Sequence, residues 1–138
     1  MKKKNLFLSV MLFFSVLPMT LFSGCDKDTN CYLEVKVVDE STSDPISGAV
    51  IAGDPIPNAV VEVYQDNGGN VQDKGVTDGS GIYTTYFNAP AIVKIKAKLQ
   101  MYDAGGNPAG ERRGETAVRL IQGETVSAKV TLSKQIIY

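Results

Sequence analysis

Histidine and tryptophan are absent from this 138-residue chain, and cysteine occurs only twice. Without histidine, the chain cannot assemble a Ser-His-Asp or Cys-His nucleophile. Two cysteines cannot complete a zinc site alone, and no glycine-rich loop opens a helix to cradle a phosphate. Carboxylates are present, but nothing in the sequence pairs two of them as acid and base. We therefore predict that the protein is not an enzyme and carries no metal or cofactor.

Positive charge is also scarce. The chain has 14 basic and 15 acidic residues, a net charge of −1. Removal of the first 24 residues would take away three lysines and leave 11 basic against 15 acidic residues, a net charge of −4. Nucleic acids and anionic lipids both require a clustered basic surface. The charge balance therefore predicts no nucleic-acid partner.

The longest apolar run lies at the N-terminus, where residues 2–4 are lysines and residues 6–17 are almost entirely apolar before Pro18. A basic start, a short apolar segment and small residues before a cleavage point are typical of a secretory signal peptide. The alternative is a retained membrane helix. It is disfavoured because residues 6–22 contain Pro18 and fall short of the ~20 residues that a span needs.

The end of this segment, LFSGC at residues 21–25, resembles the lipobox of bacterial lipoproteins. The resemblance implies cleavage between Gly24 and Cys25 and attachment of lipid to Cys25, which would hold the protein in the membrane. It predicts an outer-membrane lipoprotein of the cell envelope. The polar residues 26–28 have two interpretations, a solvated tether or a tag that directs the protein to the cell surface.

On this interpretation the chain divides into a signal peptide (residues 1–24), a short tether (25–30) and one domain (31–138). The tether reaches about 20 Å when fully extended. With Cys25 acylated, Cys31 remains as an odd thiol at the start of the domain. A disulfide, within the chain or to a second chain, is the alternative.

Hydrophobic residues in the domain alternate with polar ones at a period of two, which is the pattern of β-strands. Turn residues such as glycine, proline, asparagine and aspartate separate the alternating segments. The pattern predicts seven strands, at residues 31–39, 59–65, 71–76, 82–87, 91–99, 115–122 and 125–133. Seven short strands with frequent turns indicate an all-β fold, a seven-stranded antiparallel β-sandwich.

Two features complicate the strand pattern. DPISGAV at residues 44–50 and DPIPNAV at residues 54–60 are similar, and we expect the second copy to lead into the strand at 59–65. The first copy would then form an excursion with a short edge strand near residues 49–52. In the strand at 91–99, Lys94, Lys96 and Lys98 are expected on the outward face. Such a row is usually a solvated sheet surface, with an anion or sugar-acid site as the alternative.

Residues 55–98, PIPNAVVEVYQ through KIKAK, resemble the carboxypeptidase regulatory-like and Cna-B-like modules. The turn TDGSG at residues 77–81, followed by an aromatic strand, is the second motif in common. The resemblance implies a prealbumin-type β-sandwich over about residues 31–134. Asp78 is expected to cap its turn, and residues 66–73 to form a hairpin tip, with calcium as the alternative at both. Some Cna-B-like modules join two strands through an isopeptide bond from a lysine. Lys36 should point outward, so we expect no such bond here.

Residues 101–115 are predicted to form a long connection, and long loops are often functional. Tyr102, Arg112 and Arg113 are therefore our candidate ligand contacts. The main hypothesis is a non-enzymatic, lipid-anchored binding or adhesion module for a protein or a glycan. The alternative is a structural or assembly subunit of an envelope or cell-surface complex. Its partners would be the membrane, through the lipid, and another envelope protein.

Overall fold

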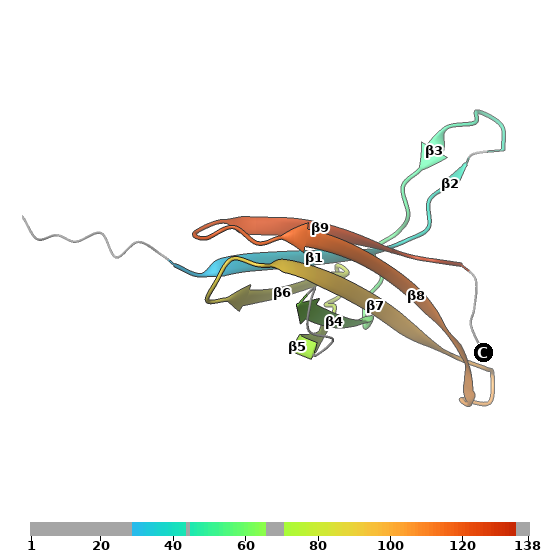
Figure 1. The fold of residues 1–138 in the computed structure, drawn as a ribbon. Coiled ribbons are helices and arrows are strands. Elements are labelled where there is room, and N and C mark those ends of the chain that lie inside the picture. The colour runs from blue at the N-terminus through green and yellow to red at the C-terminus, as the bar shows by residue number, and fades with distance from the viewer. Residues whose placement is uncertain (1–28, 44, 66–70, 135–138) are drawn as a thin grey trace, which may run out of the picture.

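The computed structural model describes residues 29–43, 45–65 and 71–134. Over these ranges the chain forms nine strands and no helix (Figure 1). They are β1 (Cys31–Asp39), β2 (Thr42–Ser43), β3 (Val50–Ile51), β4 (Val60–Gln65), β5 (Val71–Val76), β6 (Ile82–Phe87), β7 (Ile92–Tyr102), β8 (Pro108–Arg119) and β9 (Thr125–Leu132). The predicted signal peptide, Gly24 and Cys25 lie outside the described residues.

The seven longer strands form two sheets, in the orders β6-β1-β9 and β5-β4-β7-β8, and β2 and β3 form a separate hairpin. This arrangement confirms the predicted β-sandwich. One pair departs from the expected antiparallel pattern, because β1 and β9 run parallel from Tyr32↔Thr125 to Asp39↔Leu132. The first and last long strands are therefore neighbours in one sheet.

The core lies between the sheets and is built from alternate residues of each strand, because successive side chains of a strand point to opposite faces. Val35 on β1, Val63 on β4, Ile95 on β7 and Val130 on β9 are all fully buried. Cys31 is also fully buried as a free thiol. The predicted alternation of apolar and polar residues in these strands is therefore confirmed, with the apolar set buried.

The long sides of the sandwich are joined by contacts between the sheets. On one side, the Ser133 amide donates to the Arg113 carbonyl at 3.1 Å, which links the end of β9 to β8. On the other, the Tyr83 hydroxyl on β6 donates to Asp73 Oδ2 on β5 at 2.5 Å. Burial is the main cause that raises the pKa of Tyr83 to about 12, and the Asp73 carboxylate adds to it.

The predicted loop at residues 101–115 is wrong. β7 continues to Tyr102 and β8 starts at Pro108, so a long hairpin replaces the loop. Its turn is tight, because Asp103 Oδ1 accepts the amides of Gly105 and Asn107 at 2.8 and 2.9 Å. Gly114 within β8 has a packing role, because a Cβ atom there would collide with the carbonyl oxygen of Thr131 on β9.

The two DPI copies have the different structures that were expected. In the second copy, Pro55 bridges to Val38 of β1 and Ile56 is buried, immediately before β4. The first copy leads into β3, which pairs with β2 in an exposed hairpin through Thr42↔Ile51. The predicted edge strand is therefore confirmed.

The turn between β5 and β6 also has its predicted structure. Asp78 Oδ1 accepts the backbone amides of Ser80 at 2.8 Å and Ile82 at 2.9 Å. Gly81 has a φ of 72°, a conformation that favours glycine. On β1, Lys36 is exposed, which confirms its predicted outward direction.

The two hairpins β2–β3 and β7–β8 project from the same end of the sandwich (Figure 1). Asp39, at the end of β1, contacts Arg112 of β8 and precedes the β2–β3 excursion. The turn between β8 and β9 lies at the opposite end, where the Gly123 amide donates to the carbonyl of Asn30 at 2.8 Å. We call these the hairpin end and the tether end.

Candidate functional site

The three predicted ligand contacts lie on the β7–β8 hairpin but do not share one surface. Tyr102 ends β7 close to the turn and is 63% exposed. Arg112 and Arg113 follow one another on β8 and therefore point to opposite faces. The side chain of Arg113 is 59% exposed and that of Arg112 only 12%. Tyr102 and Arg113 can thus meet a ligand from solvent, whereas Arg112 is directed inward.

Arg112 ties the hairpin to the ends of two other strands. Its Nη2 donates to Asp39 Oδ1 at 2.5 Å and to the Leu132 carbonyl at 3.1 Å, and its Nε donates to the Ser133 carbonyl at 2.7 Å. The hydrogen bond from Arg112 is the main cause that lowers the pKa of Asp39. Because these donors bind the chain itself, Arg112 acts as a structural clamp.

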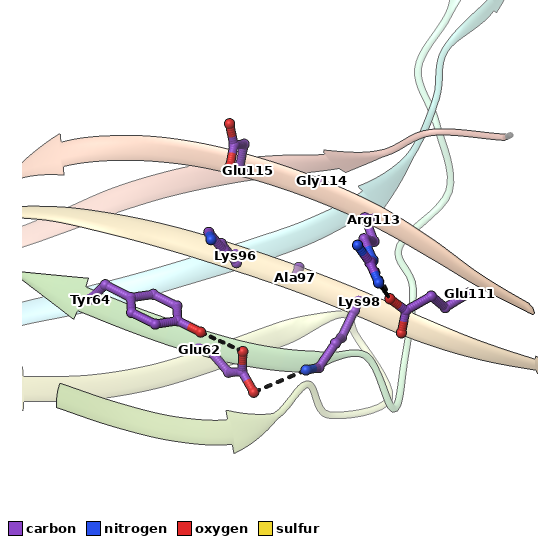
Figure 2. Close-up of a pocket in the computed structure, with 9 residues that line it drawn as sticks. All are labelled: Glu62, Tyr64, Lys96, Ala97, Lys98, Glu111, Arg113, Gly114 and Glu115. Carbon is purple, nitrogen blue, oxygen red and sulfur yellow. Dashed lines mark hydrogen bonds and ion pairs between the residues drawn. The ribbon is translucent and has the colours of Figure 1, made fainter. Parts of the chain in front are cut away.

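A hollow of about 460 Å³ lies on the outward face of the sheet β5-β4-β7-β8 (Figure 2). Arg113 faces it, bonded to Glu111 of the same strand. The lining comes from three neighbouring strands, and most of it is charged. It includes Glu62, Tyr64, Lys96, Lys98, Arg113 and Glu115. The hollow therefore suits a polar ligand that carries charge.

Glu62 is the most buried charged residue in the hollow, with 9% of its surface exposed. Its Oε1 pairs with Lys74 at 3.0 Å and with Lys98 at 3.1 Å, and its Oε2 accepts the Tyr64 hydroxyl at 2.8 Å. The Tyr64 hydrogen bond, followed by those from the two lysines, lowers the pKa of Glu62 to about 2. The same contact raises the pKa of Tyr64. Glu62 is thus held as a carboxylate that fixes its neighbours in place.

Lys96 lies at the centre of the hollow with its Nζ 5.1 Å from the centroid of the Tyr64 ring. That distance is within the range of a cation–π contact. On the other side, Lys96 is in register with Glu115 of β8. The stripe of lysines, which is exposed at Lys94 and Lys96, is therefore flanked by an aromatic residue and by carboxylates.

The sequence analysis missed Glu62 and Tyr64. Their position on the outward face follows from the alternation in VVEVYQ, at residues 60–65. Their partners follow only from the register, which sets Glu62 opposite Lys74 of β5 and opposite Lys96 of β7, one position along the face from its second ion-pair partner, Lys98. A search for carboxylates on strands that pair with the lysine strand would have found Glu62.

The hairpin end carries exposed apolar side chains. Val50 and Ile51 on β3 are 75% and 51% exposed, and Ile46 in the preceding turn is 96% exposed. Tyr102 extends this character to the β7–β8 hairpin. The three on the β2–β3 hairpin share one projecting element, and exposed apolar side chains of this kind are typical of surfaces for protein contact.

No protein-family model and no curated protein matches the chain. Among solved structures, the chain is similar to GBS52, the minor pilin of the Gram-positive pathogen Streptococcus agalactiae. The TM-score is 0.48 at 19% identity, over 80% of this chain and 47% of the pilin. It is also similar to the shaft pilin SpaA of Lactobacillus rhamnosus GG, with a TM-score of 0.33 at 13% identity, over 76% and 50% of the two chains. The chain thus spans about half the length of either pilin, and neither similarity assigns it a function.

The remaining candidate sites are the polar turns at which calcium is the alternative. In the described ranges, no three histidine, cysteine or acidic side chains come together as a metal group. The polar residues 66–70 lie outside these ranges, and Asp73 accepts the Tyr83 hydroxyl. No helix long and apolar enough to span a bilayer occurs in the part of the chain that the structure describes.

Proposed function

We propose that the protein is a non-enzymatic, lipid-anchored subunit of a cell-envelope or cell-surface assembly, which binds a neighbouring protein with its hairpin end. The observation that carries the proposal is the presence of exposed apolar side chains on both projecting hairpins: Ile46, Val50 and Ile51 on one, and Tyr102 on the other. A protein partner would bury such side chains, and apolar and aromatic groups at the centre of an interface supply much of its stability.

The position of the predicted anchor supports the same function. Lipid on Cys25 would be separated from β1 by residues 26–30, and β1 begins at the tether end. The hairpin end would then point away from the membrane, toward other envelope proteins. Glycan binding through the hairpins is less suitable, because Val50 and Ile51 offer no hydrogen-bonding groups to sugar hydroxyls.

The partner contact is tested by crosslinking in intact cells that express the full chain, followed by purification under denaturing conditions. The double variant Val50→Ser/Ile51→Ser should lose the crosslinked partner. Ile92→Ser/Ile121→Ser is the matched control, because both isoleucines are 44% exposed and belong to strand and turn segments of the tether end. Equal recovery of the partner with both variants would refute the proposal.

The anchor is tested separately. Cys25→Ser should abolish metabolic labelling with a fatty acid and leave the signal peptide uncleaved, since Cys25 is the proposed residue of both lipid attachment and cleavage. The measurement is the labelled band and the mass of the protein in the membrane fraction. Unchanged labelling and an unchanged mass would exclude Cys25 as the lipidation site.

A further inference from the structure

The outward face of the sheet β5-β4-β7-β8 has a different charge from the rest of the protein. Strand alternation and register bring six cations to this face: Lys74, Lys94, Lys96, Lys98, Arg113 and Arg119. Three carboxylates accompany them, Glu62, Glu111 and Glu115. Among the residues that the structure describes, this face therefore carries a net charge of +3, in a chain whose total is −1.

The outward face of the other sheet provides a comparison. On β6-β1-β9, the charged residues with outward register are Glu34, Lys36 and Lys129. Tyrosine, threonine and serine fill much of the remainder, with Tyr32 and Tyr86 in ring contact at 6.4 Å. The positive charge is thus concentrated on one of two otherwise similar faces.

Part of this charge is available to a ligand. Glu62 is shared between Lys74 and Lys98, so that one carboxylate serves two cations. Within the described part of the chain, Lys94 and Lys96 form no ion pair with a carboxylate. The lysines of β7 repeat at every second residue, a spacing of about 7 Å along a straight line. This row matches a linear ligand with regularly spaced negative charges.

We propose that this face binds an acidic polysaccharide, a linear chain of sugars bearing carboxylates, along the row Lys94, Lys96 and Lys98. The cations pair with the sugar carboxylates. The side chains of Glu111 and Glu115 beside the row accept hydrogen bonds from sugar hydroxyls. Tyr64, which also lines the hollow, lies under the Lys96 ammonium and so helps to position this cation for a sugar carboxylate.

The carboxylates distinguish this ligand from other polyanions. Double-stranded DNA carries one negative charge per ~1.7 Å of its axis and offers few hydroxyl donors, so Glu111 and Glu115 would repel it. An acidic peptide offers backbone N–H donors but few hydroxyls, and its closely spaced carboxylates would be repelled by the same two glutamates. A glycan is sparsely charged and rich in hydroxyl donors, and it fits both signs of charge in the hollow. The site lies on a different surface from the apolar hairpins, so the proposal stands independently of the assembly function.

The test is calorimetric titration of the purified full chain in detergent with polygalacturonate as the probe, and with dextran, poly-L-glutamate and duplex DNA for comparison. Saturable binding of polygalacturonate, without binding of neutral dextran, is expected. Lys94→Gln/Lys96→Gln should weaken it about five- to tenfold, as two exposed charge contacts are lost. Lys36→Gln/Lys129→Gln, on the opposite sheet face, should leave the affinity unchanged.

A third variant separates a glycan site from simple charge attraction. Glu111→Ala/Glu115→Ala should weaken polygalacturonate binding, because the oxygen atoms that accept sugar hydroxyls are lost, and should strengthen binding of DNA and poly-L-glutamate, because repulsion is removed. Absence of saturable polygalacturonate binding would overturn the proposal. The proposal would also be overturned if DNA or poly-L-glutamate bound the unaltered protein as tightly as polygalacturonate, or more tightly. The same holds if Lys94→Gln/Lys96→Gln and Lys36→Gln/Lys129→Gln had equal affinity for polygalacturonate. Thermal melting of each variant checks that it is folded.

Discussion

The pair Arg112 and Arg113 offers a sharp test of the fold, because two identical neighbours have opposite surroundings. Arg112 donates three hydrogen bonds to the ends of β1 and β9, and its side chain is 12% exposed. Arg113 is 59% exposed and pairs with Glu111 of its own strand. Arg112→Ala should therefore destabilise the protein strongly, and Arg113→Ala very little.

The size of the effect follows from the partners. Hydrogen bonds from a charged donor contribute about 1.5–3 kcal/mol each where both groups are buried. The Asp39 side chain is 35% exposed, so solvent reduces the contribution of its pair to ~1 kcal/mol. The bonds to the Ser133 and Leu132 carbonyls are exposed and part-buried, so they contribute ~1 kcal/mol each. Arg112→Ala should therefore lower the free energy of unfolding by about 3 kcal/mol in total. An exposed ion pair such as that of Arg113 contributes less than ~1 kcal/mol.

Thermal unfolding followed by circular dichroism measures both variants. At about 4 °C per kcal/mol for a domain of this size, Arg112→Ala should lower the Tm by roughly 12 °C. Arg112→Lys should recover less than half of this, because an ammonium group cannot reproduce the guanidinium fork. Equal Tm values for Arg112→Ala and Arg113→Ala would refute the clamp.

Three further outcomes are expected. Gly114→Ala should lower the free energy of unfolding by about 2 kcal/mol, because its Cβ would meet the Thr131 carbonyl. The control is Gly79→Ala, whose Cβ would point into open space; similar urea denaturation curves for the two variants would contradict this. Thr77→Val should lower the free energy of unfolding by about 2 kcal/mol and Thr77→Ser by much less, since the Thr77 hydroxyl donates to the Ile56 carbonyl and accepts the Ala59 amide. Equal losses of stability in the two variants would point to packing instead. For Glu62, a pKa lowered from 4.5 to about 2 contributes stability that is present above pH 4.5 and lost as the pH falls toward 2. The Tm of Glu62→Gln should therefore fall less steeply in acid than that of the unaltered protein, and parallel Tm–pH curves would exclude this linkage.

The core could be predicted because its signal is local. In β1, β7 and β9, one face of each strand is apolar for its whole length, so alternation alone identifies Val35, Ile95 and Val130 as buried. The Asp78 turn is local as well, since its acceptor and donors lie within four residues. Such features require no knowledge of which strands become neighbours.

The β7–β8 hairpin could not be predicted, because its cause lies elsewhere in the chain. Gly114 resembles a loop residue until β9 is placed against it. Arg112 resembles Arg113 until its partner Asp39, 73 residues earlier, is brought to it. The hollow has the same origin, because Glu62, Lys96 and Glu115 become neighbours only through the register of three strands.

The parallel pairing of β1 with β9 has a mechanical consequence. Cys31, the start of β1, and Leu132, the end of β9, lie at opposite ends of the same strand pair. A force applied between them acts along the strands and loads the intervening hydrogen bonds together, in shear, instead of opening them one by one. Single-molecule pulling between these positions should therefore require a higher force than pulling between Cys31 and Phe87, which are paired at one end of β1 and β6. A subunit held at its tether end and pulled from the end of β9 would resist extension through this one pair of strands.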